Sequence, residues 1–199
     1  MDSFLFCLIL VAMIALGGRE QLQVAQLSDA LTRREGGREG TRIRRPIPLL
    51  AVGLVCTVLT AGAMTYAALY LASIMPSRAA WMLVAFALAL AALELFWPVK
   101  VMPAEEPTRS LGATGLVLLW RQFGDAARFV IFAFAVEAAL PLAAFIGGAL
   151  GGGVAVTMGW GMGAQALSKW PLRWIRTGLG GGMIVAAIFI GLNARFGGP

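Results

Sequence analysis

The chain has 199 residues, of which 59% are hydrophobic and 13% are charged, and its mean hydropathy is +0.82. A water-soluble protein of this length needs more polar surface, so the composition excludes a soluble globular fold. A helix needs roughly 20 apolar residues to cross a bilayer, and six crossings would use roughly 120 of them. The apolar segments are much longer than the alternating strands of a membrane β-barrel. We therefore predict an all-α, multi-pass membrane protein with six transmembrane helices.

The formal net charge of the chain is +6, and basic proteins often bind nucleic acid. Here the arginines gather in one loop between apolar segments, which is typical of membrane topology, so we expect contact with membrane lipid and no nucleic-acid partner. The chain has no histidine and two unpaired cysteines in separate apolar runs, so no zinc site is expected. Because it also lacks a nucleophile-and-base set and a phosphate-binding loop, we predict no enzyme, no catalytic residue and no cofactor.

In chain order, the first apolar segment runs over residues 3–16, is interrupted by polar residues 17–21, and continues to Leu27. A hydrophilic loop over 32–45 follows, and it carries Arg33, Arg34, Arg38, Arg42, Arg44 and Arg45. Prolines at 76 and 98 end the next two expected helices, 47–74 and 79–97. A fourth helix is expected from residue 111, with polar residues 121–128 in its middle, and further helices over 140–167 and 172–193. No cleaved signal peptide is expected, because no basic residue precedes the first apolar run.

Four pairs of residues recur with one offset of 95 positions: Pro46 with Pro141, Gly53 with Gly148, Pro76 with Pro171 and Arg78 with Arg173. The first helices align at Gly17 and Gly124 with a larger offset, because the arginine-rich loop lengthens the first copy. We predict three-helix repeats over residues 1–97 and 111–199, joined by a cytoplasmic linker over 98–110. Three crossings in each repeat place the second repeat upside down, so the repeats are expected to be inverted.

Loop charges predict the orientation of the chain. The arginine-rich loop and a second basic loop with Lys169, Arg173 and Arg176 fall on the same side of the membrane in a six-helix topology. Because loops rich in lysine and arginine stay cytoplasmic, both termini are expected outside the cytoplasm. The expected location is the cell membrane, which in a bacterium is the inner membrane.

Glycine accounts for 25 residues, and many glycines stand four positions apart within expected helices. The clearest pairs are Gly147 with Gly151, Gly148 with Gly152, Gly159 with Gly163, and Gly178 with Gly182. This spacing is typical of close helix packing, because small residues let helix backbones approach in lipid. The alternative is a broken helix beside a substrate path, for which residues 151–153 are the candidate.

Polar clusters interrupt the first helix of each predicted repeat. The first cluster contains Gly17, Arg19, Glu20 and Gln21, and the second contains Arg121, Gln122, Gly124, Asp125 and Arg128. Ionisable groups are costly in a bilayer and usually face the bundle interior or a water-filled cavity. Inverted repeats would bring these equivalent clusters together near the midplane, where such transporters bind substrate, so we predict a substrate or ion site there.

Other polar and aromatic residues have simpler expected roles. In a continuous helix, Arg121 and Arg128 would both reach Asp125, so we expect them to hold this carboxylate as an ion. Glu94 and Glu137 fall near helix ends, where interfacial water is expected to solvate them. The tryptophans near helix ends are expected to be interfacial anchors; they are Trp81, Trp97, Trp170 and Trp174.

This layout resembles the transmembrane-protein-165-type family of divalent cation/proton antiporters, also called uncharacterised protein family 0016. Members of that family have two inverted three-helix repeats, each with a Glu-x-Gly-Asp-(Lys/Arg)-(Ser/Thr) motif in its first helix, usually followed by Gln. The similarity covers the whole chain in its proline-started helices, Pro-x-Arg turns and charged linker. It implies transport of manganese or calcium coupled to protons, with Asp125 and Gln122 at metal-binding positions.

The motifs of this chain depart from the family pattern at most carboxylate positions. In the first repeat, Ala15 stands in place of Glu and Gly18 in place of Asp, while Glu20 takes the hydroxyl position and Gly17, Arg19 and Gln21 fit the pattern. In the second repeat, Gln122 replaces Glu, Ala126 and Ala127 replace the basic and hydroxyl residues, Arg128 falls where Gln is usual, and Gly124 and Asp125 are kept. One of the family's motif carboxylates therefore remains.

This loss of carboxylates predicts altered ion handling. Manganese and calcium need several oxygen ligands, and carboxylates offset their charge and dehydration cost. The two clusters together carry three arginines (Arg19, Arg121 and Arg128) against two carboxylates (Glu20 and Asp125), so the site is expected to repel a divalent cation. We predict a small inverted-repeat transporter with altered substrate or reduced activity. The alternative is a membrane scaffold or partner-binding protein that keeps the fold and has lost transport.

The predicted topology can be tested by cysteine labelling in intact cells. Single cysteines at Arg38, Thr108 and Lys169 should react with a membrane-impermeant maleimide only after the membrane is permeabilised, because all three loops are predicted to be cytoplasmic. The unsubstituted chain is the control for its two native thiols. Labelling of the Arg38→Cys variant in intact cells would reverse the predicted orientation.

Overall fold

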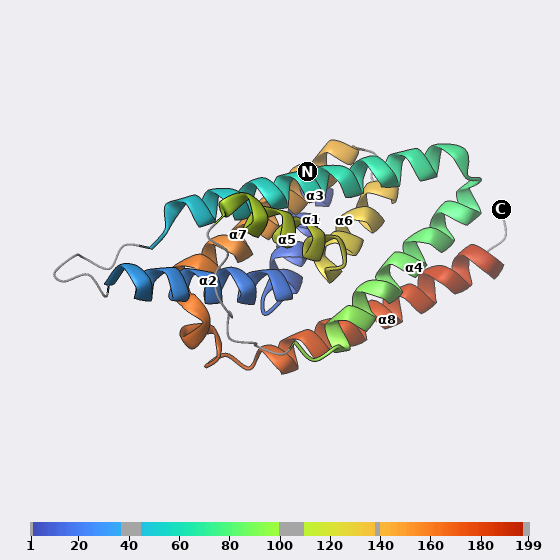
Figure 1. The fold of residues 1–199 in the computed structure, drawn as a ribbon. Coiled ribbons are helices and arrows are strands. Elements are labelled where there is room, and N and C mark those ends of the chain that lie inside the picture. Colours follow the sequence, from blue (N-terminus) through green and yellow to red (C-terminus); the bar gives the residue numbers. More distant parts are fainter. Residues whose placement is uncertain (1, 37–44, 100–109, 138–139, 197–199) are drawn as a thin grey trace.

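The computed structural model describes residues 2–36, 45–99, 110–137 and 140–196. This described part contains eight helices and no strand, which confirms the predicted all-α class (Figure 1). The helices are α1 (Asp2–Ala15), α2 (Arg19–Gly36), α3 (Ile47–Ile74), α4 (Ser77–Phe96), α5 (Leu111–Phe123), α6 (Ala126–Glu137), α7 (Pro141–Leu167) and α8 (Leu172–Phe196).

Four of these helices, α3, α4, α7 and α8, are long and apolar enough to cross a membrane. The α1–α2 pair meets the same criterion as one span that is bent by 59° over Phe4–Ala15 and Arg19–Thr32. Large apolar side chains are exposed along the long helices, among them Val55, Leu59 and Tyr66 on α3. In lipid these exposed side chains face hydrocarbon, so the described part fits a membrane protein with four or five spans.

The interruption in the first apolar segment is confirmed and has a local cause. Gly17 adopts a φ of 71°, a left-handed conformation that ends α1 and suits glycine. Its backbone N–H donates to Oε1 of Gln21 at 2.7 Å, and the N–H of Gly18 donates to the carbonyl of Ala15 at 3.0 Å. The backbone N–H groups of Gly17 and Gly18 therefore find partners within the same segment.

The prediction of one continuous helix from residue 111 through the second polar cluster is wrong. Helix α5 ends at Phe123, Gly124 has φ −92° and ψ 8°, and α6 starts at Ala126. The N–H of Asp125 donates to the carbonyl of Gln122 at 3.1 Å, which closes a tight turn in place of the helical bond. Both polar clusters consequently lie at helix breaks.

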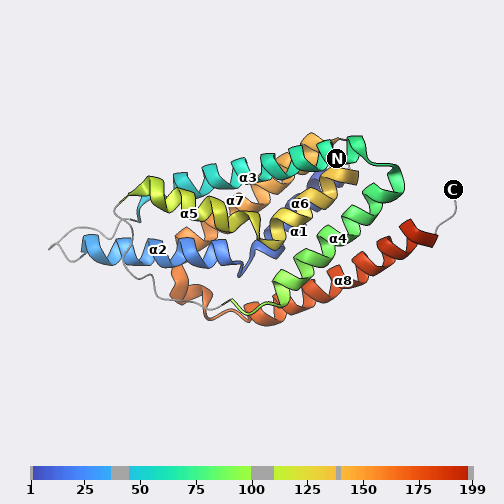
Figure 2. The same cartoon turned by 45° about the vertical axis from the view of Figure 1, so that its right-hand side comes forward.

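The two halves of the chain have the same order of elements: a broken helix, a long helix, a proline-containing turn and a second long helix. Pro46 caps α3 and Pro141 begins α7, while Pro76 caps α4 and Pro171 directly precedes α8. Helix α3 packs against α5 and α6, and helix α7 packs against α1 and α2. Helices α4 and α8 lie side by side in both views (Figures 1 and 2).

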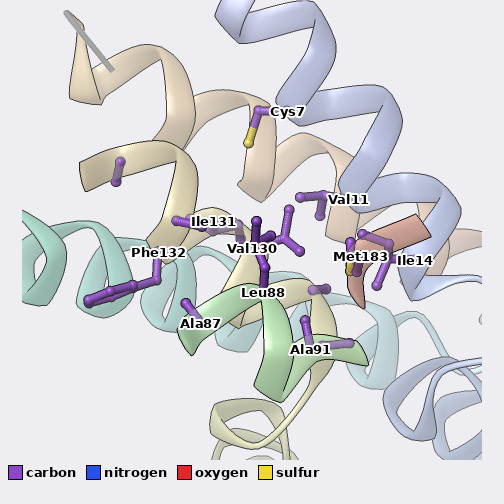
Figure 3. Packing of buried hydrophobic residues seen from close by; sticks show 14 of the residues in the cluster. Cys7, Val11, Ile14, Ala87, Leu88, Ala91, Val130, Ile131, Phe132 and Met183 are labelled. Carbon is purple, nitrogen blue, oxygen red and sulfur yellow. The ribbon is translucent and has the colours of Figure 1, made fainter. Parts of the chain in front are cut away.

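The main hydrophobic core lies where α1, α4, α6 and α8 meet (Figure 3). Its labelled members include Val11 and Ile14 from α1, Leu88 from α4, Ile131 from α6 and Met183 from α8. Alanines make up much of the rest of this core. Small side chains let these helices approach closely, as is usual for helix packing in lipid.

Three glycines of α7 confirm the close-packing interpretation for this helix. A Cβ added at Gly147 would lie 2.7 Å from the carbonyl oxygen of Phe4, and one at Gly151 would lie 2.6 Å from that of Leu8. A Cβ at Gly159 would lie 2.6 Å from the carbonyl oxygen of Gln21. Helix α7 therefore touches the backbones of α1 and α2 on both sides of their break.

Other glycines do not follow that interpretation. Gly178 and Gly182 have no neighbour within 4 Å of an added Cβ, so close packing does not explain this pair. They line a cavity of about 360 Å³ between α1, α4, α6 and α8, whose wall also includes Glu137. The proposed break at residues 151–153 is also absent, because α7 is instead kinked at Gly163, with φ 76° and ψ 168°. Oδ2 of Asp29 accepts from the Ala164 N–H at 2.8 Å beside this kink.

Two predicted loops are shorter than expected. Helix α2 continues to Gly36, so Arg33 and Arg34 belong to a helix, and residues 37–44 of the arginine-rich loop lie outside the described part. Helix α8 begins at Leu172, so Arg173 and Arg176 are helical, and Arg176 is buried. Most of the predicted linker over 98–110 also falls outside the described residues.

The contact between α7 and α1 predicts a steric difference between two glycines of the same helix. Gly151→Ala should lower stability by about 1–3 kcal/mol, because its methyl group would collide with backbone that has no room to move. Gly161→Ala is the matched control, since nothing lies within 4 Å of its added Cβ. Thermal unfolding in detergent measures both variants, and equal melting temperatures would contradict the close α1–α7 contact.

Candidate functional site

The breaks of the two broken helices meet inside the protein. A Cβ added at Gly18 would lie 3.4 Å from Oδ2 of Asp125, so residues far apart in sequence are direct neighbours. Glu20, Gln122, Asp125 and Arg128 are all buried, and Arg128 has no exposed surface at all. The structure thus brings together the two polar clusters that the sequence pattern singled out, although Arg19, Arg121 and Gly124 are exposed.

Glu20 is the centre of the first group of contacts. Nη2 of Arg128 lies 3.1 Å from Oε2 of Glu20. The Thr57 hydroxyl lies 3.0 Å from Oε1 of Glu20, and the Gln122 side-chain amide donates to the same oxygen. Oε1 of Gln122 in turn accepts from the Thr60 hydroxyl at 2.8 Å. The Glu20 carboxylate on α2 is therefore bonded to side chains of three other helices, α3, α5 and α6.

Sequence reasoning missed Thr57 and Thr60, which are both fully buried on α3. Threonine is common in membrane helices, where its hydroxyl often bonds to the carbonyl four residues earlier. Both hydroxyls also lie within hydrogen-bond distance of such a carbonyl, that of Gly53 at 3.0 Å and that of Cys56 at 2.9 Å, so each shares its one hydrogen between this carbonyl and the polar cluster. Their three-residue spacing within an apolar helix was the only signal that one face of α3 could meet a polar group.

The expected ion pairs of Asp125 do not form. Both carboxylate oxygens of Asp125 are buried without a hydrogen-bond partner, and no ion pair within 4.0 Å joins it to an arginine among the described residues. The spacing argument required a continuous helix, and the turn at Gly124 removes that condition. Arg121 turns outward, and Arg128 pairs with Glu20 instead.

A second buried ion pair joins Glu94 to Arg176. Nη2 of Arg176 lies 3.0 Å from Oε2 of Glu94, and Nη1 donates to the carbonyl of Gly17 at 3.2 Å. Arg19, which is half exposed, adds a contact of 3.4 Å to Glu94. The expectation that interfacial water solvates Glu94 is therefore wrong, because α8 supplies a partner from 82 residues away. Glu137, by contrast, is exposed.

These contacts change the predicted charge balance of the site. Arg121 faces outward, while Glu94 and Arg176 join the interior. Three arginines (Arg19, Arg128 and Arg176) then stand against three carboxylates (Glu20, Glu94 and Asp125). The expected positive site is thus a balanced one, in which Asp125 is the carboxylate without a direct partner.

Gly17 and Gln21 have structural roles at the break. Oε1 of Gln21 accepts a hydrogen bond from the Gly17 N–H, and the Gly17 carbonyl accepts one from Nη1 of Arg176. Within the described residues, no group of three or more His, Cys, Asp or Glu side chains is arranged to hold a metal ion. Gln122 uses both atoms of its amide in hydrogen bonds, so of the two predicted metal positions Asp125 is the one with free oxygens.

Comparison of the chain with protein-family models, with curated proteins and with solved structures finds no match. The resemblance to the cation/proton antiporters therefore stays a prediction that rests on the motif residues and the layout.

The buried Arg176–Glu94 pair predicts a large difference between two arginines of α8. Arg176→Ala should lower stability by about 3–5 kcal/mol, because it leaves Glu94 buried with only a half-exposed partner. Arg173→Ala, one turn away and exposed, should change stability by less than about 0.5 kcal/mol. Thermal unfolding in detergent reports both, and a mild Arg176 variant would show that water reaches Glu94.

Proposed function

We propose that this protein is a small secondary transporter built from two inverted three-helix repeats, with altered substrate or reduced activity compared with the cation/proton antiporters it resembles. In this proposal the α1–α2 and α5–α6 pairs each serve as one broken span, which makes six spans. The protein resides in the cell membrane with both termini outside the cytoplasm. The arginine-rich loop, the linker and the loop around Lys169 are cytoplasmic.

One observation carries the proposal: two broken helices meet at a buried charge cluster that includes Asp125, a carboxylate with no partner. Intramembrane charges are expensive and are usually kept for ion or proton pathways. Broken helices near the bilayer midplane are typical of transporter binding sites, because their ends present polar backbone groups to a ligand. A protein that needed only a rigid fold would gain stability from replacing such a carboxylate by an apolar residue.

The second candidate, a scaffold that no longer transports, is favoured by a different observation. Two buried ion pairs join the two halves of the chain, Arg128 with Glu20 and Arg176 with Glu94. Alternating access requires one repeat to move against the other, and strong buried pairs between the halves oppose that movement. The two candidates therefore differ in whether these pairs ever exchange partners.

Flux through reconstituted protein separates the two candidates. In proteoliposomes under a proton gradient, the wild-type chain should move manganese or calcium slowly, yet above the rate of protein-free liposomes. Asp125→Asn should abolish this flux, because it removes the buried carboxylate of the cluster that has no direct partner and can load and release a proton or cation. Glu137→Gln is the matched control, since this carboxylate is exposed and outside the cluster.

No flux above protein-free liposomes for manganese, calcium or protons would favour the scaffold. Flux that survives in Asp125→Asn and is lost in Glu137→Gln would contradict a transport site at Asp125. It would indicate a site in the cavity between α1, α4, α6 and α8, whose wall includes Glu137.

A further inference from the structure

The cavity between α1, α4, α6 and α8 combines an apolar wall with an acidic side chain. Its volume is about 360 Å³, which falls within the roughly 300–1,000 Å³ of small-molecule pockets. Phe134 and Met183 belong to the apolar wall, and Glu137 is the one charged residue that lines the cavity in the described part of the chain. Neither Glu20 nor Asp125 lines it, so the cavity is separate from the charge cluster at the helix breaks.

Glycines of α8 leave this cavity open. Helix α8 packs along α4, and its Gly178 and Gly182 line the cavity with nothing within 4 Å of an added Cβ. Both glycines are exposed, so the cavity opens at the protein surface beside them. An unfilled space of this kind forfeits the contacts that larger apolar side chains would make. The cavity is therefore accessible from outside and has room for a bound molecule.

Glu137 determines which charge the cavity favours. It is the last residue of α6 and is exposed, and no ion pair joins it to a basic side chain among the described residues. A carboxylate beside an apolar wall attracts a cation that carries an apolar body, and it repels an anion. The wall also holds the aromatic ring of Phe134, which suits an organic cation, and the flexible thioether of Met183, which adapts to ligand shape.

We propose that this cavity binds lipophilic organic cations, with the apolar body of the ligand against the wall and its ammonium group at the Glu137 carboxylate. An anionic phospholipid does not fit this charge, and a lipid with two acyl chains is too large for the cavity. The proposal goes beyond the transport of a metal ion, because it needs neither Asp125 nor any movement of the repeats.

Ligand binding by the purified chain in detergent tests the proposal. The probe is trimethylphenylammonium, and tert-butylbenzene is the matched neutral ligand of the same shape. The wild-type chain should bind the cation saturably and more tightly than the neutral ligand. Glu137→Gln should bind the cation about tenfold more weakly, because it removes the opposite charge, and should bind the neutral ligand unchanged. Calorimetry and the rise in melting temperature with ligand measure both.

Variants of α8 test where the cation binds. Gly182→Phe should fill the cavity and abolish binding of trimethylphenylammonium. Gly181→Phe is the matched control, since its added Cβ also meets nothing within 4 Å and Gly181 does not line the cavity. If Gly182→Phe does not fold, Gly178→Phe takes its place, because Gly178 lines the same cavity with the same open space.

The outcomes that would overturn the proposal are distinct. Absence of saturable binding by the wild-type chain is one, and a Glu137→Gln variant that binds the cation as tightly as the wild type is another. Equal affinity for the two ligands would show that the cavity accepts apolar molecules, such as lipid chains, without regard to charge. Equal loss in Gly181→Phe and Gly182→Phe would place the binding outside the cavity. Because these measurements involve no flux, their failure leaves the proposed function standing.

Discussion

The ion pair between Arg128 and Glu20 is the interaction on which the interior of this protein depends. Neither charge can reach water, so each needs the other, and the pair joins the helix that follows one break to the helix that follows the other. Thr57 and Gln122 complete the partners of the carboxylate from two further helices. The relative position of α2, α3, α5 and α6 is therefore specified by a polar network inside an otherwise apolar bundle.

Small residues make this burial of charge sterically feasible. Helix α7 approaches the backbones of α1 and α2 through Gly147, Gly151 and Gly159, and Gly152 leaves room for the guanidinium of Arg128, whose Nη1 would lie 3.1 Å from an added Cβ. Small side chains, mainly alanines, also fill the core between α1, α4, α6 and α8. The glycines and the buried charges are therefore linked: the glycines let the backbones approach closely, and close backbones exclude the water that would otherwise solvate the charges.

Features set by local sequence could be predicted, and features set by tertiary contact could not. The bounds of α3 and the end of α7 followed from proline and apolar length, and the convergence of the polar clusters followed from their equivalent places. The turn at Gly124 was missed because a lone glycine inside an expected helix does not by itself end the helix. The partner of Arg128 was missed because spacing identifies neighbours three or four residues away, whereas Glu20 lies 108 residues away. Arg176 and Glu94 escaped prediction for the same reason.

The long separation of Glu20 from Arg128 has a consequence for how the chain is made. At roughly 5–20 residues per second, the 108 residues between them take roughly 5 to 20 seconds to synthesise. Until then Glu20 lacks Arg128, its partner in the folded protein, and α7, whose glycines pack on both sides of the α1–α2 break, has not been synthesised. The contacts that the α1–α2 break makes in the folded protein therefore cannot form until the second half of the chain has been made. A chain truncated after the first half would therefore keep Glu20 without Arg128, its buried partner.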